Sequence, residues 1–394
     1  MGEAVKLLVM TDDRVGPAMA GSALRAWELS SVLADAGHEV RLYAATGSTL
    51  PEAGSVALSA RPPWRWADAV VAPPWILPPR AFVGRRLLIV DGTTPLLAEL
   101  AAMDQLPAVR RRRRTAAARV PLVLARADAV LAAGEAQELW WRSRLDAAGR
   151  PGVPVLQVPF GIPRDDPPDE AARIPGVPAR WRVVLWWGGV WPWLDLDTLL
   201  AARARLEGSQ ISVVVPVAPR PDGAAPGLTS AELLERAALH GLEPPQVVPL
   251  ERWIPYAHRH RVLHRASLIA VLHHPGDEAD LSFRTRALDG VWAGVPLLLT
   301  EGGAVAAIAR SRGWGAVVPA HRPKVTAAAI DLVLGEAEQQ RCRLALRAAR
   351  DAWRWNRVAE PLLAALPGLP AVGRRSRIGA AWRALWAVRP GGRV

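Results

Sequence analysis

The sequence has a single cysteine, Cys342, among its 394 residues. One thiol cannot form an intramolecular disulfide or a metal site of several thiolates, and it favours a reducing compartment. No run of about 18 uncharged apolar residues occurs, since the nearest candidate, 290–309, contains Glu301. The opening residues, MGEAVKLLVMTDD, lack the basic and apolar segments of a secretory signal. These absences predict a cytoplasmic protein without a membrane-spanning helix.

Lysine is almost absent, because Lys6 and Lys324 are the only two. Arginine therefore supplies nearly all of the positive charge behind the net charge of +12 and the pI of about 11.2. Such an excess predicts an anionic partner, for example an acidic lipid surface or a phosphorylated small molecule. A genome-wide bias towards arginine codons explains the excess equally well. Nucleic acid is not an expected partner, since the arginines form no recognisable binding motif or aromatic single-strand platform.

Apolar runs of strand length recur along the chain, with helix-length segments between them. Because such runs are typical of strands covered on both faces, the alternation predicts two doubly wound α/β domains with parallel sheets. The chain also has 36 prolines and 32 glycines, which fits many short connections. The predicted strands are 5–10, 39–44, 68–72, 87–90, 127–132, 153–158, 183–187, 211–215, 246–250, 268–272, 296–300 and 316–319.

A segment rich in proline and acidic residues, GIPRDDPPDEAARIPGVPAR, interrupts this alternation. We place a linker at 163–180, between an N-terminal domain at 1–162 and a C-terminal domain at 181–348. Residues 349–394 are expected to form terminal helices, a crossover and a basic aromatic tail. Doubly wound sheets bind ligands at the carboxyl ends of their strands, so two such domains facing each other predict a central cleft.

The chain contains, in this order, GSALRAWELSSVLADAGHEV, ADAVLAAGEAQELWWRSRLDAAGRP, VPFGIP, VLWWGGVWPWLDLDTLL and FRTRALDGVWAGVPLLLTEGG. Together these segments resemble the retaining glycosyltransferases of the glycogen-synthase-like family, glycosyltransferase family 4, in its bacterial surface-polysaccharide branch. The resemblance implies the glycosyltransferase B fold, with an acceptor side in the first Rossmann-like domain and donor binding in the second. It also implies transfer of a sugar from a nucleotide-sugar donor to a lipid-linked or polysaccharide acceptor, with retention of configuration and no metal or other cofactor.

The loop after the first strand of the C-terminal domain is a candidate donor site. Gly188 and Gly189 follow the strand and offer main-chain amides to a diphosphate. Many family members place an arginine and a lysine here, whereas this chain has Trp191 and Trp193. The acidic triplet 195–197 resembles a metal-binding motif of another glycosyltransferase fold. Since an aspartate beside a helix start more often caps the helix, a cap is expected instead.

The segment ADLSFRTRALDGVWAGVP carries the strongest site candidates. Arg284 and Arg286 precede a predicted helix and replace the cations missing from the earlier loop. The resemblance places Asp289 at the second acidic position of the family's Glu-x7-Glu motif, where it would bind the ribose. The first acidic position falls on Leu281, and the neighbouring Asp280 is the candidate to replace it as a catalytic residue. The alternative is that these are ordinary surface charges on a helix.

The N-terminal domain supplies further candidates. Gly21 and Arg25 would approach the donor phosphates from the loop after the first strand, unless that loop is only a flexible turn. Asp91 ends a strand and would orient or deprotonate an acceptor hydroxyl, or simply form a turn before a glycine. Glu135 and Gln137 follow another strand, from which they would touch the sugar or the acceptor.

The histidines do not suggest a metal centre. His258, His260 and His264 lie among arginines, which disfavour a bound cation, while His273 and His274 end a strand. No carboxylate stands at an obvious ligand spacing from any of them. We therefore expect structural or solvent-facing histidines and no metal site. Walker A, zincin and G-x-S-x-G patterns are absent as well, which disfavours kinases, proteases and esterases.

Two basic segments are candidates for contact with an anionic membrane. The run 110–114 consists of arginines, and the tail at 374–394 combines arginines with tryptophans at helical spacing. They would place the protein peripherally on the inner face of the cell membrane. The alternatives are a solvated helix face for the run and a packed terminal helix for the tail. Two rival functions stay open, a degenerate glycosyltransferase-like scaffold at the membrane and a nucleotide-sugar epimerase of the same fold.

Overall fold

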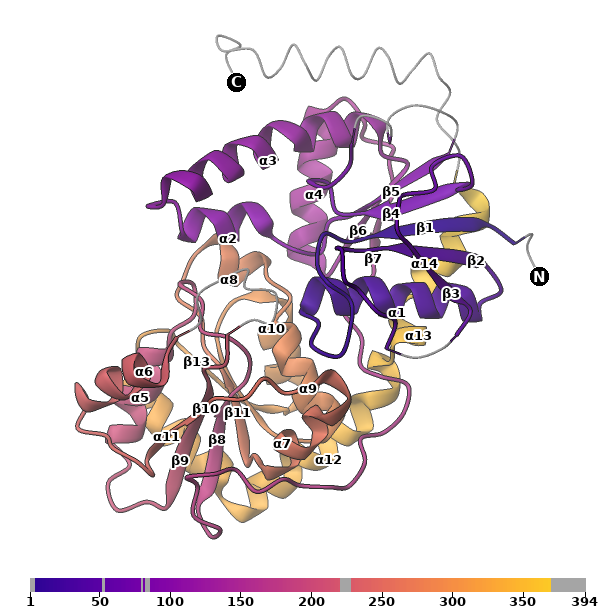
Figure 1. The fold of residues 1–394 in the computed structure, drawn as a ribbon. Coiled ribbons are helices and arrows are strands. Elements are labelled where there is room, and N and C mark those ends of the chain that lie inside the picture. The colour runs from indigo at the N-terminus through magenta and orange to yellow at the C-terminus, as the bar shows by residue number, and fades with distance from the viewer. Residues whose placement is uncertain (1–3, 52–53, 79–80, 82–85, 220–227, 370–394) are drawn as a thin grey trace. The chain divides into compact units, whose positions relative to one another are not determined.

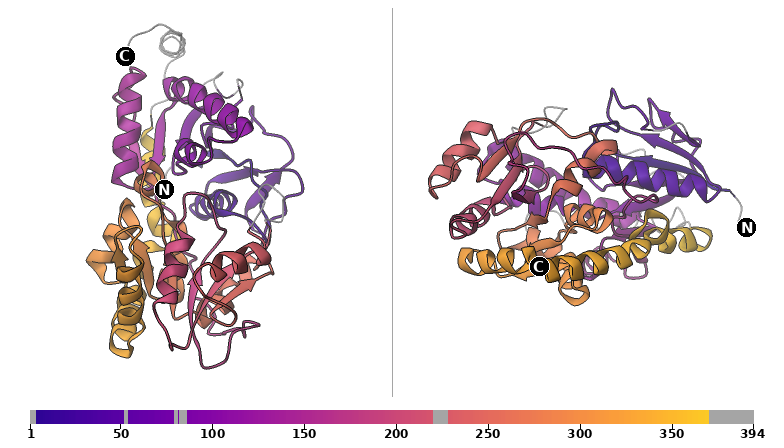
Figure 2. Two further views of the ribbon diagram at one scale, coloured as in Figure 1. Left: turned by 90° about the vertical axis from the view of Figure 1, so that its left-hand side faces the viewer. Right: turned by 90° about the horizontal axis from the view of Figure 1, so that it is seen from below.

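The computed structural model describes residues 4–51, 54–78, 81, 86–219 and 228–369. They form two compact units, one up to Phe160 together with the chain from Trp355 on, the other Gly161–Arg354. Each unit is built around one parallel sheet with helices against it (Figures 1 and 2). The predicted α/β fold class is therefore confirmed.

The sheet of the first unit has seven strands in the order β3-β2-β1-β4-β5-β6-β7, and all neighbours pair in parallel. Every run predicted here contains a strand. The edge strand β3 was not predicted, because only one of its four residues is buried and no continuous apolar run marks it. The strands are β1 (Lys6–Met10), β2 (Glu39–Tyr43), β3 (Val56–Ser59), β4 (Ala69–Ala72), β5 (Leu87–Asp91), β6 (Ala129–Ala132) and β7 (Val155–Gln157).

Helix α1 begins the first unit's helical layer and buries Ala23, Ala26, Leu29 and Leu33, which share one face at helical spacing. The basic run 110–114 lies on α3, whose interior also contains Pro121. The chain returns to this unit at its end, since α13 contacts α1 and α14 contacts β7. The helices are α1 (Gly21–Asp35), α2 (Leu96–Ala102), α3 (Pro107–Arg126), α4 (Glu135–Ala147), α13 (Trp355–Val358) and α14 (Glu360–Ala365).

The second unit has a six-stranded parallel sheet in the order β10-β9-β8-β11-β12-β13. Its central strands β11 and β12 are wholly buried, which explains their uninterrupted apolar sequence. The strands are β8 (Arg182–Trp186), β9 (Ile211–Pro216), β10 (Val247–Leu250), β11 (Leu268–Val271), β12 (Leu297–Thr300) and β13 (Gly315–Val318). The helices are α5 (Leu196–Ala204), α6 (Ser230–Ala238), α7 (Arg259–Arg265), α8 (Asp277–Leu281), α9 (Thr285–Ala293), α10 (Gly303–Arg312), α11 (Pro323–Leu334) and α12 (Glu336–Trp353).

The sequence predicts no membrane-spanning helix and two basic segments that contact a membrane. Among the described residues, no helix is both long and apolar enough to cross a bilayer. The basic run is helical, with Arg110, Arg111, Arg112 and Arg114 exposed and Arg113 half-buried. The predicted interfacial tail at 374–394 lies outside the described residues.

Candidate functional site

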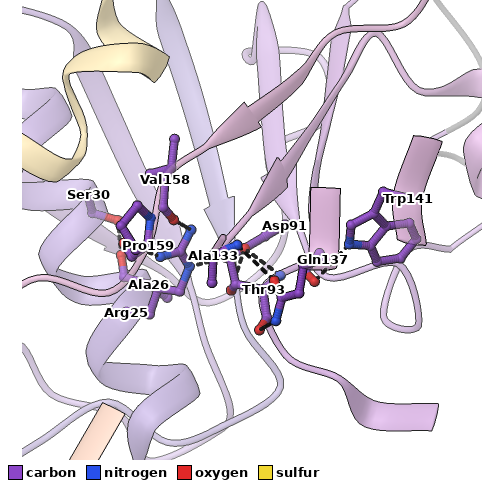
Figure 3. Close-up of polar contacts among 11 residues, drawn as sticks. Arg25, Ala26, Ser30, Asp91, Thr93, Ala133, Gln137, Trp141, Val158 and Pro159 are labelled. Atoms are coloured by element: carbon purple, nitrogen blue, oxygen red, sulfur yellow. Dashed lines mark hydrogen bonds and ion pairs between the residues drawn. The ribbon is translucent and has the colours of Figure 1, made fainter. Parts of the chain in front are cut away.

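In the first unit, the Asp91 carboxylate is held from both sides at the end of β5 (Figure 3). Arg25 Nε donates to Oδ2 over 2.7 Å, and Thr93 Oγ1 donates to Oδ1 over 2.8 Å. The Asp91 side chain is 12% exposed. Because charge-assisted bonds fix its direction, the carboxylate presents a small, oriented surface at the carboxyl edge of the sheet.

The rest of the Arg25 guanidinium faces the interior of the unit. Its Nη1 donates to Pro159 O over 3.0 Å and its Nη2 to Val158 O over 2.9 Å. Its guanidinium carbon lies 5.4 Å from the centroid of the Phe160 ring. This placement differs from the expected contact with donor phosphates, because the carbonyls after β7 and Asp91 use its donors. We therefore assign Arg25 to positioning Asp91, whereas Gly21 is exposed at the start of α1.

Gln137 joins the loop after β5, which follows Asp91, to the loop after β6. It is buried on α4, where its Oε1 accepts from Ala133 N over 2.7 Å and its Nε2 donates to Thr93 O over 2.9 Å. Trp141 Nε1 donates to Gly92 O over 3.0 Å. A Cβ on Gly92 would lie 2.3 Å from that nitrogen, so the residue after Asp91 must be glycine. Gln137 thus has a structural contact in place of the expected substrate contact.

Glu135, the other candidate site residue on α4, is accessible to solvent. It is the first residue of the helix and is exposed, two positions before buried Gln137. Strands β5 and β6 are parallel neighbours, so the loops after them open at one edge. Glu135 and Asp91 therefore belong to the same edge of the first sheet.

A separate hollow of about 350 Å³ lies beside α3, within the first unit. It combines apolar walls with guanidinium groups on one helix, a lining that suits an amphiphilic anion. Arg119 is fixed in part, because its Nη1 donates to Trp75 O over 2.5 Å. The walls of the hollow include Trp75, Ile76, Leu96, Arg111, Arg112 and Arg119, together with the acidic side chain of Asp12.

In the second unit, the loop after β8 meets the start of α9. Gly188 has φ of +91°, and a Cβ there would lie 2.9 Å from Arg286 Nε. The half-buried Arg286 side chain therefore lies against the Gly188 main chain, with exposed Gly189 next to it. Further along the same loop, the Trp191 and Trp193 rings stack with their centroids 5.2 Å apart. The structure thus brings together two parts of the predicted donor site, the loop with Gly188 and Gly189 and the side chain of Arg286.

Asp289 is held in the same region by two side chains. Trp187 Nε1 donates to Oδ2 over 2.7 Å, and Arg259 Nε donates to Oδ1 over 2.9 Å. The Arg259 guanidinium lies 3.7 Å from the centroid of Tyr256 and 4.0 Å from that of Trp292. The Asp289 side chain is 25% exposed. Sequence reasoning missed Arg259, since no spacing rule connects it to a residue on another helix.

Arg284 differs from its neighbour Arg286, because it is 3% exposed. Its Nη1 donates to Thr300 O and its Nη2 donates to Glu301 O over 2.9 Å. Burial lowers the pKa of Arg284 to about 10. These bonds hold the turn between β12 and α10, where a Cβ on Gly303 would lie 2.9 Å from Ala279 O. Arg284 thus makes structural contacts through its two terminal nitrogens, and its expected phosphate contact stays a prediction.

A buried acid–histidine pair, which the sequence analysis did not predict, joins the loop after β11 to helix α8. His273 Nδ1 and Glu278 Oε2 are 2.8 Å apart. Burial raises the pKa of Glu278 to about 7 and lowers that of His273 to about 2, because both charged forms lose solvation. The predicted catalytic Asp280 is instead exposed, and a Cβ on Gly302 would lie 3.0 Å from its Oδ1. The sequence alone does not indicate this pair, because the two residues lie five positions apart across a turn.

No protein-family model matches the chain, and no curated protein matches it by sequence. Solved structures do resemble it. Sucrose-phosphate synthase from Thermosynechococcus elongatus has a TM-score of 0.67 at 14% identity, covering 98% of this chain and 100% of that chain. HepE from Anabaena, in complex with UDP-glucose, has a TM-score of 0.62 at 15% identity, covering 93% and 100%.

A third similar structure is WaaG, a glycosyltransferase involved in lipopolysaccharide biosynthesis, with a TM-score of 0.62 at 15% identity. The likeness covers 91% of this chain and 98% of that chain. All three comparisons extend over both α/β units, each with its own parallel sheet. The chain therefore has the glycosyltransferase B fold of two Rossmann-like domains.

Proposed function

We propose that the protein is a glycosyltransferase that transfers a sugar from a nucleotide-sugar donor to an acceptor with retention of configuration. The observation that carries the proposal is the contact between Arg286 and the Gly188 loop at the carboxyl edge of the second sheet. In doubly wound sheets this edge is where phosphorylated ligands bind. The likeness in fold to HepE in complex with UDP-glucose supports a nucleotide sugar as the donor.

On this proposal, the second unit binds the donor. The Gly188 and Gly189 amides and Arg286 stabilise negative charge that develops on the departing diphosphate. Asp289 accepts from the ribose, with its carboxylate oriented by Arg259 and Trp187. No step here calls on a metal or other cofactor.

Two acids are candidates for the missing first position of the acidic motif. Asp280 is exposed beside the Gly302 turn, whereas Glu278 is buried against His273. A group that touches the sugar must be accessible, so we assign the sugar contact to Asp280. Glu278 then acts through His273 as a positioning residue, together with the Arg284 bonds that hold the same turn.

The acceptor would bind to the first unit. Asp91 orients or deprotonates its hydroxyl, since Arg25 and Thr93 hold the carboxylate in a fixed direction. Glu135 at the same edge would contact the acceptor or the sugar. The hollow beside α3 combines apolar walls with Arg111 and Arg112, which suits a lipid-linked acceptor with a phosphate group. The exposed arginines of α3 would then hold the enzyme peripherally on the cytoplasmic face of the membrane.

Calorimetry with a panel of nucleoside diphosphates and nucleotide sugars tests the donor assignment. Loss of a charged hydrogen bond of about 1.5–3 kcal/mol predicts roughly 10- to 100-fold weaker binding by Arg286→Ala. Arg341→Ala is the matched control, because that exposed arginine pairs with Glu338 on α12. If no nucleotide binds, or if the two variants bind alike, the donor site is wrong. Absence of nucleotide binding would favour the alternative function, a degenerate glycosyltransferase-like scaffold. The buried positions of Arg25 and Arg284 are compatible with that function as well.

A further inference from the structure

Three side chains that are far apart in sequence converge at the carboxyl edge of the second sheet. His274 Nδ1 and His321 Nε2 are 2.8 Å apart, and His321 Nε2 lies 3.6 Å from Asp195 Oδ2. One ligand atom from each of the three residues lies within 4.8 Å of the others. We infer that Asp195, His274 and His321 form a binding site for Zn²⁺.

The main chain holds two of these residues in fixed relation. Residues 193–195 pair with 272–274, because Asp195 N donates to Leu272 O over 2.9 Å and His274 N donates to Trp193 O over 3.0 Å. Leu194 and His273 form an antiparallel bridge between these bonds. The third residue, His321, precedes α11, which packs against α5, the helix that Asp195 caps. The ligands are thus placed before any ion arrives.

The Asp195 carboxylate is oriented as a metal ligand needs to be. Its Oδ1 accepts from Thr198 N over 3.0 Å, and its Oδ2 accepts from Thr198 Oγ1 over 2.6 Å. These bonds confirm the predicted helix cap and leave further lone pairs on both oxygens. They also supply the outer hydrogen bonds that hold ligating carboxylates in metal sites. The cap and the metal site are therefore compatible.

His321 gives two further indications. Among the described residues it is the only one besides glycine with a positive φ, 56°. Such a conformation is uncommon for residues other than glycine, although histidine adopts it more often than most, and it concentrates at functional positions. Its side chain is 56% exposed, whereas that of Asp195 is 3% exposed. An ion therefore has a path from solvent past His321 to the buried carboxylate.

The donor set selects the metal. Two imidazole nitrogens and one carboxylate oxygen suit Zn²⁺ in a tetrahedral site whose fourth ligand is water. With bonds of about 2.0–2.1 Å, ligand atoms in such a site are roughly 3.3 Å apart, which lies within the spread seen here. The neighbouring His273 takes no part in this cluster, because its side chain pairs with Glu278, whereas that of His274 faces His321.

A bound Zn²⁺ would join the loop between β8 and α5 to the ends of β11 and β13. That loop carries the Gly188 turn and the stacked Trp191 and Trp193 rings. The ion would therefore fix the course of the loop without needing to touch a substrate. The inference does not depend on the proposed transferase activity.

Zinc binding is tested on the full-length protein, first stripped with a chelator and then titrated with Zn²⁺ against a chromophoric competitor. The wild type should bind one equivalent. His274→Ala and His321→Asn should each weaken binding by more than about 100-fold, since each loses a direct ligand. Asparagine tolerates the positive φ at 321 and still removes the imidazole. His258→Ala, at an exposed histidine before α7, is the control and should bind like the wild type.

Asp195→Asn separates the ligand from the helix cap, because asparagine caps a helix about as well as aspartate. It should weaken Zn²⁺ binding by roughly 10-fold or more while leaving the melting temperature of the metal-free protein nearly unchanged. If His274→Ala does not fold, His321→Asn decides the matter. A wild type that binds no stoichiometric Zn²⁺, or a His321→Asn variant that binds as tightly as the wild type, overturns the inference.

Discussion

The two units use arginine at their candidate sites in parallel ways. In the first, buried Arg25 orients Asp91, and in the second, buried Arg259 orients Asp289. Arginines that lie nearer the surface, such as Arg286 and those of α3, stand beside the glycine loop or the hollow. Burial thus separates the two arginines that position a carboxylate from those that lie where an anionic ligand could reach them.

The pair in the first unit is the more buried, so its disruption should have the largest effect. Arg25→Ala leaves the Asp91 carboxylate without its cation and should lower the free energy of unfolding by about 3–5 kcal/mol. Urea denaturation followed by circular dichroism measures this change. Asp91→Asn in the same background should restore part of the loss, because it removes the uncompensated charge. An Arg25→Ala variant as stable as the wild type would contradict the positioning role.

The Arg259–Asp289 pair in the second unit is more exposed than the Arg25–Asp91 pair. Asp289 is twice as exposed as Asp91, with 25% of its side chain exposed against 12%. Arg259→Ala should therefore cost less, about 2–3 kcal/mol in the same assay, and should also weaken nucleotide binding through Asp289. If Arg259→Ala proves more destabilising than Arg25→Ala, exposure does not rank the two pairs.

A pH series tests the buried Glu278. Burial raises its folded-state pKa from 4.5 to about 7. Its contribution to stability is thus complete below pH 4.5 and is lost as the pH rises through about 7. Glu278→Gln cannot titrate, so its stability relative to the wild type should rise over this range, by about 3 kcal/mol for a pKa raised from 4.5 to about 7. Unfolding curves at several pH values show the slope, and parallel profiles would contradict the raised pKa.

Substitution of Gly188 should have the smallest effect on stability. Comparing it with substitution of Gly208 separates the cost of backbone strain from the cost of the contact with Arg286. Gly188→Ala places a Cβ 2.9 Å from Arg286 Nε at φ of +91°, whereas Gly208→Ala meets nothing within 4 Å at φ of +70°. Both should cost about 1 kcal/mol in stability from the positive φ alone. Only Gly188→Ala should also weaken nucleotide binding, by roughly 10-fold, since it displaces Arg286. Equal nucleotide binding by the two variants would contradict a role of the Gly188 loop in donor binding.

Much of the fold follows from the sequence, because buried strands leave continuous apolar runs. Each predicted run contains a strand, while the edge strand β3 leaves no such trace. Glycine positions were also informative, since Gly188 and Gly92 mark close approaches that a Cβ would block. These features are local or periodic, and a single sequence displays them directly.

The partners of polar side chains could not be predicted in the same way. Main-chain carbonyls accept from Arg25 and Arg284, and a sequence does not show which carbonyl a folded loop will present. The convergence of Asp195, His274 and His321 likewise depends on strand order, which brings β8 beside β11 despite their distance in the chain. Residue type drew attention to Arg25 and Arg284, but the fold determined their partners, and the sequence did not indicate His321 at all.

A crystal structure with a bound nucleoside diphosphate would test the assignment of the donor site. We expect the diphosphate to lie within hydrogen-bonding distance of the Gly188 or Gly189 amide and of Arg286, with Asp289 on the ribose. Arg25 and Arg284 should keep their bonds to main-chain carbonyls. A diphosphate bound instead by Arg25 or Arg284, or a nucleotide bound away from the carboxyl edge of the second sheet, would contradict this assignment.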